Sequence, residues 1–373
     1  MPWVLIVLAA IIGLLAALNV WVKRQALSTD SWTNASSKLL ENGEVRNALS
    51  VYLVDQLYEN VDVGKAISDR LPPSAKGIGP PLAAAIEPQL VQRTSHLLGR
   101  PKVQQLWKEA NRRAHQAFMN LLNGKHGLLK TTNGNVVLDL QPILNELAQQ
   151  SGVAAKALSK LPPDAGQIVV MKGTQLDAAR KTVKVIRVLS YFLGFLVLAL
   201  FAAAVYIAHP RRRRMLMAAG VSLLIVGFIV LIVRRFAGNY IVDALTSNPD
   251  DKRAISASWA IGTALLRNVG INILVYGILI SFAAWIAGPS RPAVWVRRVS
   301  APTMRDRPYV LYGVVAFVLL IVLLTGPTDG SRVYPLLLLF ALAFVGTEVL
   351  RRQTLREFPA AEDPPALTPS GAS

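Results

Sequence analysis

The sequence contains no cysteine, which excludes disulfide bonds, thiolate metal sites and cysteine nucleophiles. Charged residues are also scarce. They make up 17% of the 373 residues, whereas a soluble globular protein carries about 25%. Hydrophobic residues reach 53%, and the mean hydropathy is +0.40. This balance is typical of a membrane protein that also has some soluble mass.

The sequence also lacks every catalytic and metal-binding motif that we can recognise. No P-loop and no Gly-x-Ser-x-Gly elbow occurs, and the four histidines are not spaced as metal ligands on a helix. We therefore predict no metal, no cofactor and no catalytic residue, and we expect a protein that is not an enzyme. An envelope enzyme with an unrecognised site remains an alternative hypothesis.

Ionisable side chains are absent from the cores of six long apolar runs, each near the ~20 residues that a transmembrane helix requires. We predict that all six span the membrane and that the first acts as an uncleaved signal anchor. The runs are residues 2–22, 188–208, 215–233, 269–287, 308–326 and 333–350. The lack of charged groups in their cores argues against an ion-coupled transporter, because such groups carry the coupling.

The net charge is +18, and much of the basic excess lies in short loops beside these runs. Residues 210–214, 289–307 and the start of the tail 351–373 hold twelve Lys and Arg residues, including Arg211, Arg212, Arg213 and Arg214. Basic loops stay in the cytoplasm, so we predict a multi-pass plasma-membrane protein with both termini cytoplasmic and a disordered tail. The basic excess then faces anionic membrane lipids, and we expect no binding to nucleic acid.

Residues 23–187 have the composition of a soluble domain and carry a net charge of +9. Their pattern predicts mainly helices, and Val45, Leu49, Leu53 and Leu57 form the apolar face of one of them. Strand-like segments at 128–131 and 136–140 flank Asn133-Gly134, and 167–171 is a third. A helical pattern also runs from Thr174 into the apolar run at 188, and another is amphipathic at 252–268, within a loop predicted at 234–268.

The predicted fold class is therefore mainly α. It is a six-helix transmembrane protein with a helical extracytoplasmic domain at 23–187, which carries a small β-hairpin or three-stranded sheet. The domain and the loop at 234–268 are predicted to lie on the face opposite the basic loops.

The most distinctive candidate binding patch lies at Leu106–His115. On a helix, Trp107, Asn111 and His115 fall along one stripe at i, i+4 and i+8, and Arg112 lies beside them. One interpretation is a polar and aromatic ledge that holds a sugar or an anionic polymer. The structural alternative is a core tryptophan, with Asn and His binding the backbone of neighbouring elements.

Several segments together resemble a family of uncharacterised multi-pass membrane proteins from actinobacteria and related bacteria. They are Thr29-Asp30-Ser31-Trp32, Leu106–His115, Val136–Leu140, Leu161–Val170 and Ala287–Pro292. The resemblance implies a signal anchor, a helical extracytoplasmic domain and further spans. It implies no activity and no catalytic residues.

Three functions are compatible with these observations. The first is a non-enzymatic envelope-associated binding or scaffold protein, whose partners are membrane lipids and either an anionic envelope polymer or another membrane protein. A homo-oligomer is one form of the latter. The second is a membrane transport or lipid-handling component without an ionisable coupling site. The third is the unrecognised envelope enzyme.

Overall fold

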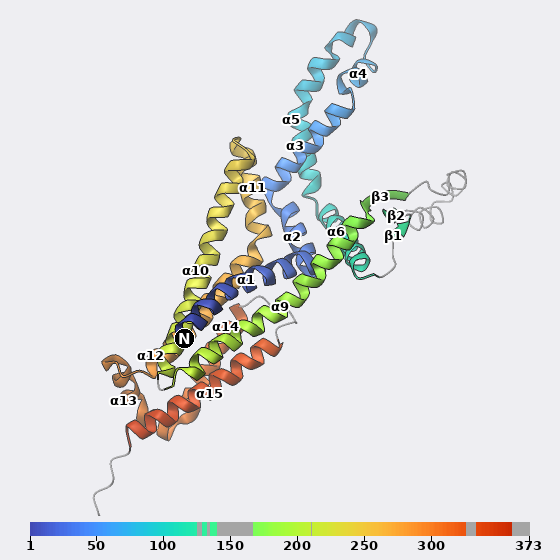
Figure 1. Ribbon diagram of the computed structural model, residues 1–373. Helices are drawn as coiled ribbons and strands as arrows, with labels where there is room; N and C mark the ends of the chain where they lie inside the picture. The colour runs from blue at the N-terminus through green and yellow to red at the C-terminus, as the bar shows by residue number, and fades with distance from the viewer. Residues whose placement is uncertain (125–128, 133–134, 140–166, 210, 326–332, 360–373) are drawn as a thin grey trace, which may run out of the picture. The chain divides into compact units, whose positions relative to one another are not determined.

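A computed structural model describes residues 1–124, 129–132, 135–139, 167–209, 211–325 and 333–359 (Figure 1). The chain divides into two compact units, and each is described on its own. The first unit comprises Met1–Gly13, Leu196–Phe228 and Gly270–Ser373. The second unit comprises Leu14–Phe195 and Ile229–Val269.

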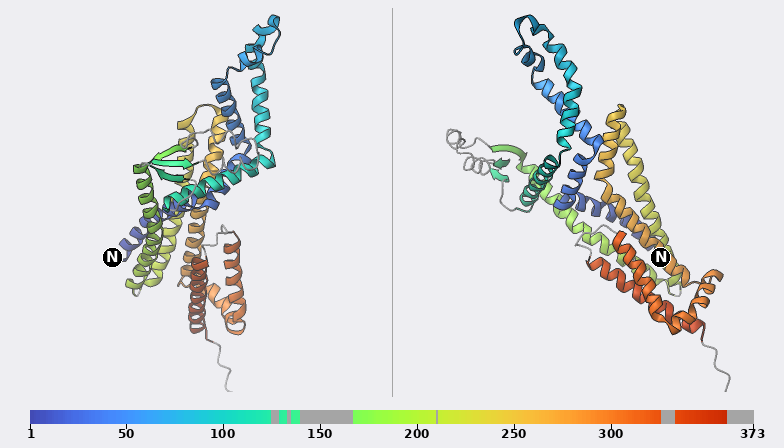
Figure 2. Two further views of the ribbon diagram at one scale, coloured as in Figure 1. Left: turned by 90° about the vertical axis from the view of Figure 1, so that its right-hand side faces the viewer. Right: turned by 180° about the vertical axis from the view of Figure 1, so that it is seen from behind.

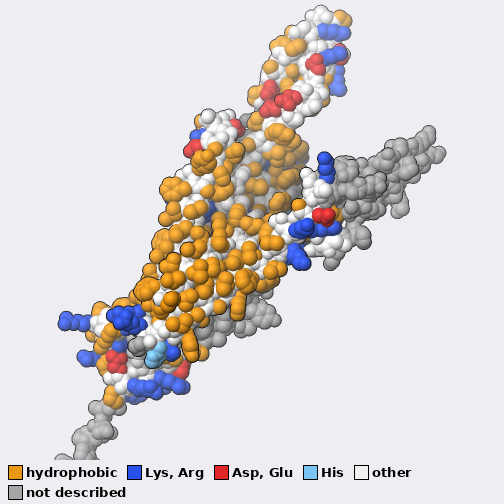
Figure 3. Space-filling model, in the orientation of Figure 1, with side chains coloured by type: hydrophobic (Ala, Val, Ile, Leu, Met, Phe, Trp, Pro, Cys, Tyr) orange, Lys and Arg blue, Asp and Glu red, His pale blue; other side chains and the backbone are white. Residues whose placement is uncertain are grey.

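Four helices in the described part of the chain are long and apolar enough to cross a membrane by length and composition. They are α1 (Pro2–Leu27), α9 (Gly173–Ile207), α10 (Arg212–Leu245) and α12 (Ala264–Ile286). At 1.5 Å per residue, each exceeds the ~30 Å of a bilayer core. Apolar side chains cover much of the visible surface of α9 and α10 in Figure 3. The predicted runs at 2–22, 188–208, 215–233 and 269–287 lie in these helices, and the helical pattern from Thr174 is part of α9.

The prediction of six spans is wrong, because the described residues contain four such helices. The run expected at 308–326 forms α14 (Pro308–Thr325), but its described apolar part, Pro308–Ile321, reaches only about 21 Å. The run expected at 333–350 lies in α15 (Val333–Glu357), which ends in a charged segment. Glu348, within that run, accepts hydrogen bonds from Tyr312 and Arg352.

The second unit is built from short helices in which local sequence sets the boundaries. They are α2 (Thr29–Glu41), α3 (Gly43–Asn60), α4 (Val63–Ser68), the 3₁₀ helix η1 (Pro73–Ile78), α5 (Gly79–Leu98) and α6 (Pro101–Leu122). Ser28, Asn42 and Asp62 cap α2, α3 and α4, each through a side-chain oxygen that accepts from a first-turn N–H. In Figures 1 and 2, α3 and α5 lie side by side as a helical hairpin.

A further helix, α11 (Pro249–Gly262), packs on α2 and α3. It lies between α10 and α12, so it links two candidate spans to the hairpin. It ends at Gly262, and Thr263 interrupts the helical backbone before α12 begins at Ala264. The amphipathic segment expected at 252–268 therefore belongs to two helices.

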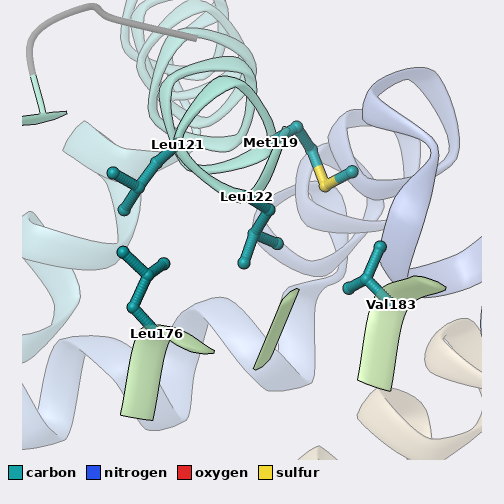
Figure 4. Packing of buried hydrophobic residues seen from close by; sticks show 5 residues of the cluster. All are labelled: Met119, Leu121, Leu122, Leu176 and Val183. Carbon is teal, nitrogen blue, oxygen red and sulfur yellow. The ribbon is translucent and has the colours of Figure 1, made fainter. Parts of the chain in front are cut away.

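The best-defined apolar cluster of the second unit joins the end of α6 to the start of α9. Met119, Leu121 and Leu122 pack against Leu176 and Val183 (Figure 4). Arg180 adds a hydrogen bond from its guanidinium to the carbonyl oxygen of Leu121, at 3.0 Å. The polar first part of α9 is thus held by the domain, and its apolar part follows directly.

Three short segments of the second unit have strand backbone, namely β1 (Leu129–Thr132), β2 (Asn135–Asp139) and β3 (Gln167–Lys172). They pair antiparallel in the order β1-β2-β3. The expected fold class still needs correction here, because the described residues are overwhelmingly helical and these short paired segments are not supported as a sheet component of the fold. Strand pairing over only four to six residues has marginal stability on its own. The turn expected at Asn133-Gly134 and residues 140–166 lie outside the described residues.

The helices of the first unit approach closely where side chains are small. Ile6 of α1 packs with Ala204 of α9, with Ala208 just after it, and with Met215 of α10. Gly220 and Gly227 of α10 and Gly270 and Gly277 of α12 form the other close contact. A Cβ at Gly277 would lie 2.8 Å from the backbone nitrogen of Leu224 and 2.9 Å from the carbonyl oxygen of Gly220. Small residues allow helix backbones to approach in this way in membranes.

The segment predicted as a basic loop at 289–307 is mostly an additional helix, α13 (Arg291–Asp306). It buries Ala293, Arg297, Ala301 and Met304, which recur at helical spacing. Trp295 and Val299 remain exposed. This mixture of arginine with exposed aromatic and aliphatic side chains is typical of a helix that lies at a membrane interface.

Candidate functional site

The predicted patch at Leu106–His115 lies on α6, where α6 packs against α2. His115 is buried and joins three elements. Its Nε2 lies 3.1 Å from the carbonyl oxygen of Ala26, and its Nδ1 lies 3.0 Å from the hydroxyl of Thr29. Because a carbonyl only accepts, Nε2 carries the proton in this arrangement. The ring also stacks on Trp32, with centroids 5.3 Å apart.

The other three residues of the patch are also bound within the second unit. Trp107 donates from its indole nitrogen to the carbonyl oxygen of Ser36 at 3.0 Å, and Arg112 pairs with Asp30 at 2.9 Å. Asn111 donates to the carbonyl oxygen of Trp107 on its own helix. Three of the four side chains therefore fasten α6 to α2 or to the end of α1. These contacts match the alternative in which the patch binds neighbouring backbone and holds the helices together. A ligand at this patch stays a prediction.

Most of the buried residues of α2 have small side chains. Thr33, Ser36, Ser37 and Leu40 are all buried. Small residues let the two helices approach closely, which explains why an indole on α6 can reach a backbone carbonyl on α2. The sequence signal for this contact is the recurrence of Thr and Ser at helical spacing in α2.

The apolar face of α3 is covered along only part of its length. Val45 and Leu49 are partly buried, and Arg253 of α11 lies 3.4 Å from Glu44 beside them. Farther along, Leu53 and Leu57 are 42% and 46% exposed, and Val61, which follows the last residue of the helix in an extended conformation, is 44% exposed. These three residues are called the α3 stripe below. Another side of α3 packs on α5, where the Tyr58 hydroxyl donates to the carbonyl oxygen of Ala83 at 2.7 Å.

A shallow acidic depression lies at the end of the hairpin, between α3, α4 and α5. Its volume is about 390 Å³, and its charged lining residues are Glu59, Asp62 and Glu87. Burial, and then the charge of Glu87, raise the pKa of Tyr58 at its edge. Among the described residues, no three His, Asp or Glu side chains are grouped so that they could hold a metal ion. The depression is therefore not a metal site of that kind.

A second depression, in the first unit, is basic. It has a volume of about 780 Å³, and the ends of α12 and α15 and the starts of α10 and α13 line it. Its charged residues are Arg213, Arg297, Arg352, Arg356 and Glu357. Of the four arginines predicted to set the topology, Arg213 lies here, and Arg212 packs over the ring of Tyr206. Arg211 and Arg214 are exposed. Sequence reasoning treated the three basic segments as separate loops and missed that they line one cavity.

The fold and these sites define a helical protein with four candidate membrane spans and a helical domain in its second unit. No protein-family model, curated protein or solved structure matches the chain. The resemblance to an actinobacterial membrane family therefore stays a prediction, and any function must be inferred from the sites themselves.

Proposed function

We propose that this protein is a non-enzymatic membrane scaffold, which binds another envelope membrane protein through the α3 stripe. The observation that carries the proposal is that Leu53 and Leu57, and Val61 just after the helix, stay exposed, although Val45 and Leu49 earlier on α3 are partly buried. Exposed apolar side chains arranged along one helix face, rather than scattered singly, are typical of an interaction surface.

Charge favours a protein partner over an anionic polymer. The hairpin from Gly43 to Leu98 has six Asp and Glu and five Lys and Arg, although the whole chain carries +18. A surface that binds an acidic polymer needs a basic excess, which this hairpin does not have. A nearly neutral surface with an apolar stripe instead suits the apolar helix face of another protein.

The stripe can contribute useful binding energy. Fully burying a Leu or Val side chain contributes about 1.5–3 kcal/mol, and each of the three is a little under half exposed. Covering the remainder would contribute about 1 kcal/mol for each residue. Three such residues, with polar contacts around them, are enough for a specific interaction of moderate affinity.

The contacts of α11 support a scaffold function, because they connect the hairpin to a helix that contains a candidate span. Arg253 of α11 lies beside Glu44 of α3, and Trp259 of α11 donates to the carbonyl oxygen of Arg234 on α10 at 3.1 Å. Arg234 in turn donates from Nε to the hydroxyl of Thr263 at 2.9 Å. The base of the hairpin is therefore attached, through α11, to the part of α10 that belongs to the second unit.

A photo-crosslinking residue in place of Val61, in cells that make the full-length chain, tests the proposal. We expect a discrete adduct heavier than the 40.5 kDa chain, which the additional changes Leu53→Ser and Leu57→Ser remove. Gln92, an exposed polar position on α5, is the matched control. Equal adducts from Val61 and Gln92, or no adduct from Val61, would refute the proposal. An adduct of twice the mass would replace the heterologous partner with a second copy of this chain.

The proposal includes a plasma-membrane location, with the helical domain extracytoplasmic and both termini cytoplasmic. Because the chain has no cysteine, single cysteines at Asn135 and at Ser290 report the two sides without background. In intact cells, an impermeant maleimide should label the Asn135 variant alone. Labelling of the Ser290 variant alone would invert the orientation and move the search for partners to the cytosol.

A further inference from the structure

The basic depression of the first unit gathers residues from three distant parts of the sequence. Arg213 comes from the start of α10, Arg297 from α13, and Arg352 and Arg356 from α15. Gly288 and Pro289 supply backbone between α12 and α13. Four arginines and one glutamate give the lining a formal charge of +3. Like charges repel, so an assembly of this kind is favoured when an anion binds in it.

Arg297 forms the fixed wall of the cavity. Its side chain is 2% exposed, and its Nε and Nη2 both donate at 2.9 Å to the carboxylate of Glu357. Its Nη1 donates to the carbonyl oxygens of Gly288 and Ile286. The charge of Arg297 is therefore offset by Glu357, and its role is to join α13, α15 and the end of α12.

The other arginines keep donors available. Arg213 uses its Nε, which donates to the carbonyl oxygen of Ala284 at 3.0 Å. A Cβ at Gly288 would lie 2.5 Å from Nη2 of Arg213, so the missing side chain makes room for this guanidinium. The Nε of Arg352 donates to the carboxylate of Glu348, and the side chain of Arg352 is 70% exposed. In the described contacts, the Nη groups of Arg213 and Arg352 have no protein acceptor.

Guanidinium groups with free Nη donors match the geometry of phosphate oxygens, which they bind in pairs. A cavity of about 780 Å³ has room for a phosphate group and the glycerol attached to it. On this basis, we propose that the basic depression binds a phosphate monoester or diester, and that the source of this phosphate is the headgroup of an anionic lipid.

The neighbouring helix supports the lipid source. Trp295 of α13 is 64% exposed and Val299 is 59% exposed, so this helix presents apolar side chains beside the cavity wall. Lys and Arg side chains gather around α13 in Figure 3. A helix with that combination lies at the boundary between headgroups and acyl chains, which is the depth at which lipid phosphates are found. This inference is independent of the α3 stripe, which belongs to the second unit.

Binding can be measured on the full-length protein in a neutral detergent, by the anisotropy of phosphatidylglycerol with a fluorescent acyl chain. The test variant is Arg213→Gln with Arg356→Gln. The matched control is Arg211→Gln with Arg291→Gln, which removes the same charge from exposed positions outside the cavity. We expect the test variant to weaken binding about tenfold or more, because charge-assisted hydrogen bonds are lost, and the control to change it little. Unchanged melting temperatures verify that both variants are folded.

Glycerol 3-phosphate and inorganic phosphate, added as competitors, distinguish the two sources of phosphate. If the lipid binds and neither solute displaces it at comparable concentration, the headgroup is the ligand. If the solutes bind as tightly as the lipid, the cavity is a phosphate site for soluble compounds, and the lipid source is refuted. Equal losses in the test and control variants, or no binding of lipid and solutes, would overturn the phosphate site itself.

Discussion

The close approach of α10 and α12 makes a prediction with a definite magnitude. In Gly277→Ala, the new Cβ would lie 2.8 Å from the backbone nitrogen of Leu224, where ordinary contacts begin at 3.4 Å. The obstructing atoms belong to backbone, so a side-chain rotation cannot relieve the clash. The helices must separate by about 0.6 Å, and overpacking of this kind costs roughly 1–3 kcal/mol.

The assay is thermal unfolding of the full-length protein in detergent, followed by far-ultraviolet circular dichroism. We expect Gly277→Ala to lower the melting temperature by several degrees. The control is Gly194→Ala, because Gly194 lies in the apolar part of α9 and a Cβ there meets nothing within 4 Å. Alanine favours helix over glycine by about 0.5–1 kcal/mol, so this control should be neutral or slightly stabilised. If the melting temperatures of the two variants changed in the same direction by the same amount, the close contact between α10 and α12 would be refuted.

Three further predictions concern the second unit. Thr263→Val should destabilise the protein by about 1–3 kcal/mol in denaturant titrations, since the Nε of Arg234 would lose its hydroxyl partner. His115→Phe keeps a ring against Trp32 but leaves two polar groups unpaired, and should cost a similar amount; a variant as stable as the wild type would contradict the buried hydrogen bonds. The pKa of Tyr58 is raised above 10.0, so the unfolded chain ionises first, and the stability present below pH 10 falls as the pH rises through the folded pKa. Denaturation midpoints between pH 9 and 11 should therefore fall less steeply for Tyr58→Phe than for the wild type.

Sequence predicted the parts of this fold that local physics determines. Apolar runs without charge gave all four candidate spans, and the unbroken helical pattern after Thr174 predicted that α9 continues beyond its apolar part. The count of six was wrong, because only four helices in the described residues are long and apolar enough to cross a membrane, and α15 ends in a charged segment from Glu348 onward. Helix α13 was not predicted, because residues 289–307 were interpreted only as a basic loop between two apolar runs. Proline is tolerated in the first turn of a helix, as at Pro292.

The sites were harder to predict, because they depend on contacts between distant segments. The spacing of Trp107, Asn111 and His115 correctly placed them on one helix, but spacing could not reveal that Ser36 and Ala26 supply their acceptors. In the same way, counting arginines loop by loop predicted sidedness but not the cavity. The partner of Arg297, Glu357, lies 60 residues away, and no local pattern connects them.

The contact between α2 and α6 also sets the order in which the domain can form. The bond between Thr29 and His115 joins residues 86 positions apart, and the α3–α5 hairpin lies between them. At about 5–20 residues per second, the ribosome needs roughly 4–17 s to add that stretch. Hairpin contacts are more local and close first, because shorter loops lose less entropy. During that interval α2 carries a face without its partner, so a nascent chain should be most vulnerable to proteases between Thr29 and Glu41.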